Sequence, residues 1–183
     1  MTDKQRQKIV SRLNGRNQMI AFEAAKLVWD DPDPLLEPSL IRILKRGRRP
    51  LNRAAAAYAM QIVRSPKTIR SLENVVREKS ESPRVRGEAA EALAHYHRPA
   101  SHGVLLDGLA DSSKDVRFWC AFSLGEMAEK RAIPLLQQLV TSDKKIVKGF
   151  HSVAKEAADA LQNIEIEKIG HRRRNGCVFF VRR

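Results

Sequence analysis

The side chains that could carry chemistry are few and scattered. His95, His97 and His102 lie within a stretch of eight residues, and three imidazoles near one turn could collect a metal ion. Their spacing matches no standard zinc site. The sequence also contains no Ser-His-Asp order, no glycine-rich phosphate loop and no His-Glu-x-x-His motif. We therefore predict no catalytic residues, no metal site and no cofactor, and we interpret the histidines as solvated turn residues.

The composition defines the elements that would have to position any site. Of the 183 residues, 43% are hydrophobic but only 5% are aromatic, so alanine supplies much of the apolar surface, which favours closely packed helices. No apolar run is long enough to span a bilayer, and no apolar signal segment follows the N-terminus. The two cysteines, Cys120 and Cys177, lie too far apart to indicate a disulfide framework. These features predict a soluble, mostly helical, cytoplasmic protein.

The charge of the chain is strongly basic and uneven. Lys and Arg outnumber Asp and Glu by 34 to 21, which gives a net charge of +13. The excess lies in three segments, residues 3–16, 40–53 and 171–183, and the rest of the chain is nearly balanced. Such patches attract anionic partners, namely nucleic acid, an acidic protein face or a membrane surface, although basic clusters at turns and termini are also ordinary solvated surface.

A short motif recurs along the chain. Residues 85–93, VRGEAAEAL, align with residues 116–124, VRFWCAFSL. The small-residue pair at the centre of the motif also aligns with positions 24–25, 56–57 and 157–158, so the repeat is about 31 to 37 residues long. This self-similarity is the sequence signature of a repeat architecture.

Each repeat has the pattern of two helices. The first carries small residues beside a leucine, and the second carries apolar residues at i, i+3 and i+4. One helix pair cannot bury its apolar face alone, so we predict an all-α protein, a right-handed α-α superhelix (α-solenoid) of about four and a half helical hairpins. The predicted segments are a capping helix over 3–13, units over about 16–47, 48–80, 81–111, 112–142 and 143–164 within a repeat domain of 1–164, and a basic C-terminal tail over 165–183.

The repeat resembles a known family. The run Val-Arg-x-x-Ala-Ala-x-Ala-Leu, followed by a turn and a Pro-Leu-Leu second helix, is similar to the HEAT-like repeat, above all to the short phycobilin-lyase type. Residues 115–139 are the clearest copy, and the similarity covers about 16–163. Unit one departs from it at residues 20–22, and unit five carries an insertion of about six residues in its first helix. The resemblance implies second helices that line a concave face, and such arrays serve as scaffolds, adaptors and occasionally enzymes.

Two tryptophans need an interpretation beside this resemblance. Trp29, with Asp30 and Asp31 after it, resembles the aromatic and acidic residues of DNA alkylbase glycosylases built on HEAT-like repeats. No matching aromatic set follows on the later second helices, so we interpret Trp29 as a packed residue beside a carboxylate turn. Trp119 and Cys120 occupy predicted core positions, and Cys120 should be a buried, inert thiol.

The concave face implied by the resemblance is the best place for a binding site. Apolar residues of the second helices in units one and two should face the core and turn basic residues outward. The predicted partner-binding strip consists of Arg42, Lys45, Arg46, Arg70, Asn74 and Arg77. Units three and four place His102, Asp107, Gln137 and Gln138 there, so the strip stops halfway. A nucleic-acid groove would continue it, whereas an acidic protein segment fits a half-basic groove.

The tail has a different composition from the repeats. Asn175 and Gly176 separate two β-prone runs, which is the strongest short signal for a β-hairpin, over about 168–174 and 177–182. A disordered arginine-rich arm that orders on binding is the alternative. We favour a hairpin that caps the last helix pair over one that covers a partner or a second copy. Candidate contacts with a partner or nucleic acid are Arg172, Arg173 and Arg174.

Three functions are consistent with the sequence. The first is a non-catalytic scaffold or adaptor that binds a protein partner on its concave face, where an acidic partner would fit the basic strip. The second is nucleic-acid binding through the basic patches, and the third, from the resemblance alone, is a phycobilin-lyase-like chromophore or protein-modification factor. The sequence favours a role other than that of an enzyme and leaves the oligomeric state open.

Overall fold

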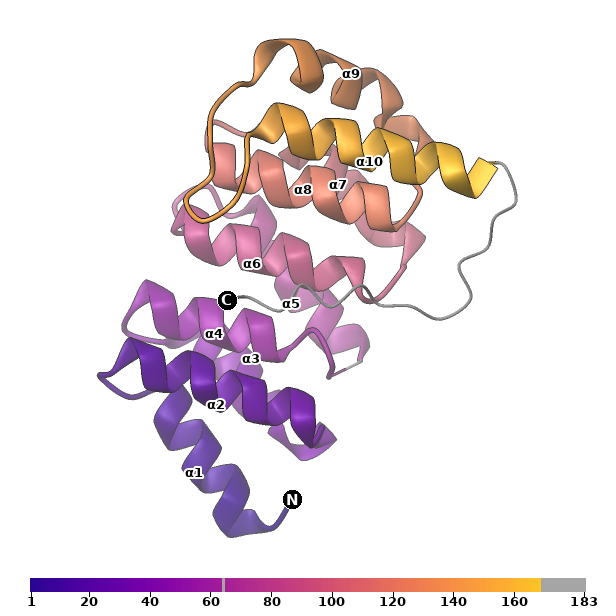
Figure 1. The fold of residues 1–183 in the computed structure, drawn as a ribbon. Coiled ribbons are helices and arrows are strands. Elements are labelled where there is room, and N and C mark those ends of the chain that lie inside the picture. The colour runs from indigo at the N-terminus through magenta and orange to yellow at the C-terminus, as the bar shows by residue number, and fades with distance from the viewer. Residues whose placement is uncertain (64, 169–183) are drawn as a thin grey trace.

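The computed structural model of the protein describes residues 1–63 and 65–168 (Figure 1). This part of the chain is all-α, as predicted, and its only β-type pairing is an isolated antiparallel bridge between Ile146 and Ser152. Its α-helices are α1 (Asp3–Leu13), α2 (Gln18–Asp30), α3 (Glu37–Arg46), α4 (Pro50–Ala59), α5 (Pro66–Arg77), α6 (Pro83–Ala94), α7 (His102–Gly108), α8 (Lys114–Glu126), α9 (Ile133–Ser142) and α10 (Val153–Lys168). None of these helices is long and apolar enough to cross a membrane.

The helices stack in two layers. Figure 1 shows α2, α4, α6, α8 and α10, hereafter the first helices, side by side, with α3, α5 and α7 behind them and α9 at the far end. The first helices pack on one another, and each second helix (α3, α5, α7 and α9) also packs on the first helix that follows it. The predicted α-solenoid is therefore confirmed, and α1 covers its N-terminal end against α2.

The first helices approach closely because their contact surface is made of small side chains. Ala54 to Ala57 in α4 are all fully buried, as are Ala89 and Ala90 in α6. A Cβ atom on Gly125 of α8 would lie only 2.7 Å from the Cα atom of Ala160 in α10. Any larger residue there would push the two helices apart, so glycine and alanine set the layer spacing.

The second helices supply the larger apolar side chains of the core. In α3 the buried residues are Leu40, Ile43 and Leu44, and in α5 they include Leu72, Val75 and Val76. This spacing of three and four residues is the single stripe that the sequence predicts. It leaves the other side of each second helix free to carry charge.

A ladder of arginine–carboxylate pairs joins successive units. Each ladder arginine lies three residues before the small-residue pair of its helix and binds an acid in the connection before the next first helix. The pairs are Arg53 with Glu81, Arg86 with Asp111, and Arg117 with Asp143. Each arginine also donates to a carbonyl oxygen of the preceding second helix or connection, those of Gly47, Val76 and Asp111.

The two ends of the array differ from this pattern. Counted from the small-residue pair, the ladder position holds Ala21 in α2 and Ala154 in α10. At the N-terminal end the buried side chain of Asn52 donates instead to the carbonyl oxygens of Leu13 and Gly15, at 2.6 and 3.1 Å, and so ties α1 to α4.

The C-terminal end corrects one prediction and leaves others open. The insertion in unit five does not lie in its first helix: the extra residues form the connection 143–152, and α10 begins only at Val153. Residues 165–168 are the last residues of α10. Apart from Lys168, the predicted hairpin and its three arginines, Arg172, Arg173 and Arg174, lie outside the described residues. The predicted unit boundaries stay predictions.

Candidate interaction face

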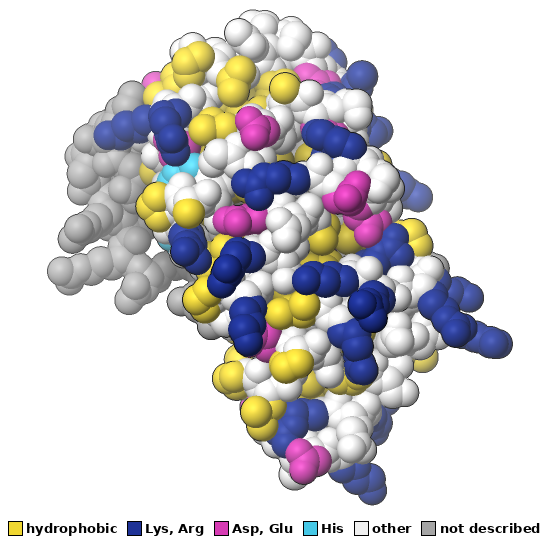
Figure 2. All heavy atoms as spheres, turned by 180° about the vertical axis from the view of Figure 1, so that it is seen from behind, with side chains coloured by type: hydrophobic (Ala, Val, Ile, Leu, Met, Phe, Trp, Pro, Cys, Tyr) yellow, Lys and Arg dark blue, Asp and Glu magenta, His cyan; other side chains and the backbone are white. Residues whose placement is uncertain are grey.

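The six residues of the predicted strip lie on adjacent second helices. Arg42, Lys45 and Arg46 come from α3, Arg70, Asn74 and Arg77 come from α5, and all six are exposed. The view from behind in Figure 2 shows Lys and Arg side chains gathered over this part of the molecule. The structure thus brings the six residues onto one side of the array. That this side is concave and binds a partner stays a prediction.

The acidic residues on the same face are held by the next unit. The Glu37 carboxylate accepts hydrogen bonds from the hydroxyls of Ser65 and Thr68, the latter at 3.0 Å. One unit later the Glu73 carboxylate accepts from the Ser101 hydroxyl at 2.7 Å. Both glutamates are only partly exposed. Because these carboxylates point between the units, the basic groups are the outermost charges of the face.

A pocket lies at the Arg42 end of the strip, between α1 and α3. Its volume is about 400 Å³, and its walls include Val10, Leu35 and Arg42. The Leu35 side chain is 67% exposed, which is unusual for a leucine in a turn of this array. Beside the pocket Arg6 donates to Asp33 at 2.7 Å, and this hydrogen bond lowers the pKa of the Asp33 carboxyl. The pocket therefore combines an apolar floor with a charged rim.

The strip ends at α5, as the sequence predicts. In the next units Asp107, Gln137 and Gln138 are exposed where basic residues stood before. His102 is partly buried, and its Nδ1 atom pairs with the Glu129 carboxylate. Arg131 also donates to Glu129, at 2.9 and 3.0 Å. The hydrogen bonds from Arg131, and then from His102, lower the pKa of Glu129 to about 2.

The three clustered histidines do not share a site. The ring of His95 packs edge-on against Trp29, with ring centroids 5.5 Å apart. His97 is exposed in the turn after α6, and His102 pairs with Glu129 as described above. Within residues 1–63 and 65–168, no group of three His, Cys, Asp or Glu side chains has an arrangement that could hold a metal ion.

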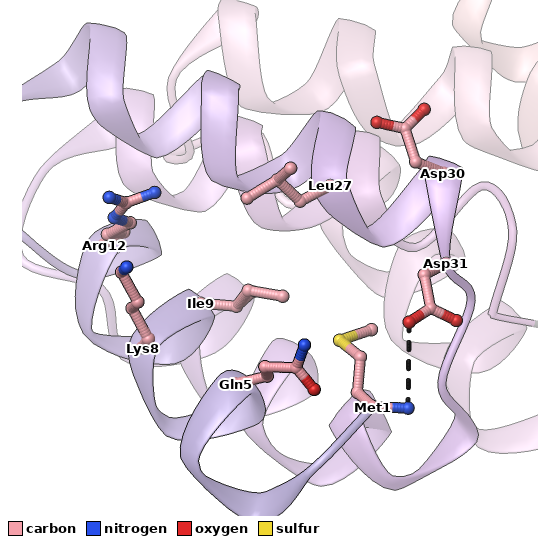
Figure 3. Close-up of a pocket in the computed structure, with 8 residues that line it drawn as sticks. All are labelled: Met1, Gln5, Lys8, Ile9, Arg12, Leu27, Asp30 and Asp31. Carbon is pink, nitrogen blue, oxygen red and sulfur yellow. Dashed lines mark ion pairs between the residues drawn. The ribbon is translucent and has the colours of Figure 1, made fainter.

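Trp29 and the two aspartates that follow it point in different directions. The indole Nε1 donates to the carbonyl oxygen of Tyr58 at 3.4 Å, and the ring packs against Tyr58 and His95. Asp30 and Asp31 border a separate pocket of about 290 Å³ between α1 and α2 (Figure 3). There the Asp31 carboxylate faces the amino group of Met1 at 3.7 Å. The interpretation of Trp29 as a packed residue beside a carboxylate turn fits this geometry.

Cys120 and Trp119 are core residues, as predicted. The Cys120 thiol is fully buried, and burial raises its pKa to about 12. A thiol that stays protonated is a poor nucleophile. The Trp119 ring meets Phe118, Phe122 and Phe150 at centroid distances of 5.1 to 5.6 Å. Neither residue is available for chemistry at the surface.

Sequence reasoning missed the ladder. The motif drew attention to Arg86 and Arg117, but not to their acidic partners, which lie 25 and 26 residues further along the chain. A signal was present, because Glu81, Asp111 and Asp143 recur at about the repeat length. Asp111 shows the result: burial alone would raise its pKa, but hydrogen bonds from Arg86 and Lys79 outweigh this and hold the pKa well below its usual range.

The stacked helix pairs define a helical-repeat protein, an α-solenoid. The sequence model of the HEAT repeats matches residues 7–94 and 75–162, and the chain belongs to this family. No curated protein matches the chain.

Proposed function

We propose that the protein is a non-catalytic scaffold that binds a partner protein through an acidic segment of that partner. The site is the α3–α5 face, defined by Arg42, Lys45, Arg46, Arg70, Asn74 and Arg77. The observation that supports it most is the separation of charge on this face. Glu37 and Glu73 are engaged between units, so five cations stand outermost on two neighbouring helices.

The pocket beside Arg42 adds a feature of the partner. Charges at an interface mainly set the association rate and the specificity, whereas affinity comes from a few apolar or aromatic groups that fill pockets. The pocket between α1 and α3, with exposed Leu35 in its wall, suits such a group. The partner segment would then be acidic along α3 and α5, with one large apolar side chain at its α1 end.

Direct binding by charge-reversed variants tests the proposal. A partner is captured from native lysate with nuclease present, purified, and titrated against the wild type and against Arg42→Glu/Lys45→Glu/Arg46→Glu. We expect a loss of affinity of about 10-fold or more, chiefly in the association rate and smaller at high salt. The matched control is Arg98→Glu/Lys130→Glu/Lys148→Glu, which changes the net charge equally at exposed sites outside α1, α3 and α5.

Two results would contradict the proposal. One is an equal loss of affinity in the control, which would show that only the overall charge matters. The other is capture that disappears with nuclease. Leu35→Asp tests the pocket separately, and it should lower the affinity further by slowing association little and speeding dissociation strongly.

A further inference from the structure

The topology brings five connections to one edge of the array. Second helices and α1 run toward this edge and first helices run away from it, so every connection into a first helix lies there, on the left of Figure 1. The connections are residues 14–17, 47–49, 78–82, 109–113 and 143–152. We call this edge, with the first residue of α8, the basic margin.

Basic residues occur at every unit of the margin. Its exposed Lys and Arg side chains are Arg16, Arg48, Arg49, Lys79, Lys144, Lys145 and Lys148, and Lys114 is partly exposed. In Figure 2 Lys and Arg side chains follow the right-hand edge of the molecule, which is the same edge seen from behind. Unlike the α3–α5 face, the margin is basic from α2 to α10.

The ladder explains why the margin is basic although its sequence contains acids. Glu81, Asp111 and Asp143 belong to the same connections, but they turn inward to Arg53, Arg86 and Arg117. Their side chains are only 13%, 0% and 7% exposed. Glu81 and Asp143 are therefore balanced inside the array, whereas Asp111 also binds Lys79 of the margin. The other outward lysines and arginines form no ion pair within the described residues and keep their charge.

Few acids remain exposed on the margin. Glu78, at the end of α5, is exposed and accepts a hydrogen bond from the Ser80 hydroxyl at 2.6 Å. Asp115 in the first turn of α8 is half-buried. These two carboxylates lie near the middle, so the two ends of the margin carry the strongest positive charge.

The length of the row suits a polyanion. Packed helices lie about 10 Å apart, so five units extend over about 40 Å. Duplex DNA presents a phosphate about every 3.4 Å along each strand, so the row would cover about 12 base pairs. Besides His151, the five connections contain one aromatic side chain. This is Phe150, which is half-buried against Phe118 and Trp119. The margin therefore has charge to hold a backbone but no exposed phenyl or indole ring on which bases could stack.

We propose that the basic margin binds the phosphate backbone of double-stranded nucleic acid without reading its bases. This inference does not depend on the proposed function, because the margin and the α3–α5 face are different surfaces. A membrane fits less well, since Ile146 is the only large apolar side chain exposed on the margin within the described residues, and it lies at one end. Anionic vesicles are nevertheless one arm of the test.

The experiment measures the affinity for a 24-base-pair mixed-sequence duplex by fluorescence anisotropy between 50 and 200 mM salt. Arg16→Gln/Arg48→Gln removes charge at one end, and Lys145→Gln/Lys148→Gln removes it at the other. Within the described part of the chain, the side chains of these four residues form no hydrogen bond, so their replacement should not disturb the fold. Each pair should weaken binding about 10-fold at 100 mM salt and reduce the slope of log K against log salt by about 2.

Controls separate the margin from overall charge. Lys4→Gln/Arg98→Gln loses the same charge elsewhere and should change the affinity less than about 2-fold. Lys145→Arg/Lys148→Arg keeps the charge and should bind like the wild type. When the two pairs of substitutions are combined, their fold-losses of affinity for the 24-base-pair duplex should multiply. For a hairpin with a 6-base-pair stem, about 20 Å long, the losses should not multiply, because this hairpin reaches only half of the row.

Several outcomes would overturn the inference. Binding that is absent or insensitive to salt would exclude phosphate contacts. An equal loss in the control pair would place the contact elsewhere. Binding to phosphatidylserine vesicles that depends on Lys145 and Lys148, with no binding to the duplex, would assign the margin to a membrane surface. Thermal unfolding of each variant within about 2 °C of the wild type shows that it is folded.

Discussion

The two edges of the array hold their units together in different ways. At the basic margin the connections place acids against buried arginines of the preceding first helix. At the opposite edge, where first helices lead into second helices, the chain turns through residues with positive φ, His97 at 44° and Ala128 at 50°. The basic margin is joined by a repeated arginine–carboxylate pair, whereas the opposite edge combines these turns with a different pairing, that of Glu129 with His102 and Arg131.

This difference shows how a repeated ion pair can leave one edge of the array positively charged. An acid that pairs with a buried arginine is largely withdrawn from the lysines outside, and among the ladder acids Asp111 alone also binds one of them, Lys79. The ladder therefore leaves outward positive charge along this edge. At the opposite edge Asp30 and Asp31 are exposed, while Glu129 is buried against His102 and Arg131, so the charge there is mixed. The basic margin is thus a by-product of the interaction that holds the array together, available for binding.

Breaking the ladder should have the largest effect on stability. Arg86→Ala leaves Asp111 buried with a weakened set of partners, and removing one member of a buried ion pair typically costs about 3–5 kcal/mol. We expect urea denaturation to show a loss of this size. The matched exposed variant Arg98→Ala, at the opposite edge, should change the stability by less than about 0.5 kcal/mol. Equal effects of the two variants would contradict the comparison.

The last unit, which lacks a ladder arginine, offers a pH test. Glu156 of α10 is buried, and burial, together with Asp159 and Glu126, raises its pKa to about 8. When a carboxyl has a higher pKa in the folded protein than in the unfolded chain, its contribution to stability is fully present at pH values below the unfolded pKa. This contribution is lost as the pH rises through the folded pKa, here about 8. The free energy of unfolding should therefore fall by on the order of 2–4 kcal/mol between pH 5 and 9.

Glu156→Gln is the check on that assignment. Glutamine keeps the size of the side chain and cannot ionise, so the variant should lose most of the pH dependence and be more stable than the wild type at pH 9. His151 Nε2 lies 2.8 Å from the Glu156 carboxylate and is retained as a partner. A variant that keeps the slope of the wild type would assign the titration to another group.

At the opposite edge the paired acid should matter less than the ladder. Glu129→Gln weakens the hydrogen bonds to His102 and Arg131, and we expect a cost of about 1–2 kcal/mol at pH 7 in urea denaturation. The pKa of Glu129 is lowered to about 2, so its contribution is present above the ordinary carboxyl pKa and is lost as the pH falls toward 2. The difference between variant and wild type should therefore shrink in acid.

The smallest effect should come from the backbone of the same edge. Ala128 follows α8 with φ of 50°, its N–H donates to the carbonyl of Gly125, and the N–H of Glu129 donates to that of Leu124. This is a Schellman arrangement, in which glycine is preferred at the left-handed position. Ala128→Gly should raise the stability by about 0.5–1 kcal/mol. Ala100→Gly, at an exposed site with negative φ, should lower it slightly.

The sequence predicted those parts of the fold that repeat within one unit. The small-residue pairs of α2, α4, α6 and α8 are buried, as is Ala157 of α10, and the stripe of Leu40, Ile43 and Leu44 faces the core. The outward position of Arg42, Lys45 and Arg46 follows from the same 3.6-residue period. The insertion of unit five was predicted at the wrong place because an alignment of repeats shows that residues are added but not whether they lengthen a helix or a connection.

What could not be predicted depends on neighbours that are distant in the chain. The acid that binds Arg86 lies 25 residues away, and the basic margin exists only because five connections meet at one edge. The inward direction of Asp111 and Asp143 depends on buried arginines that can reach them, Arg86 and Arg117. The hydrophobic periodicity of a sequence does not show which arginine and which acid lie close enough to pair.

The amino-acid sequence by itself determined the helical repeat, the faces of the helices and the excess of positive charge, because each depends on residue type and on spacing within one helix. The tertiary structure alone decided which charges are neutralised inside the array and which remain at the surface. The physical reason is that ion pairing acts through space over a few ångströms, between residues that stacking brings together from different units.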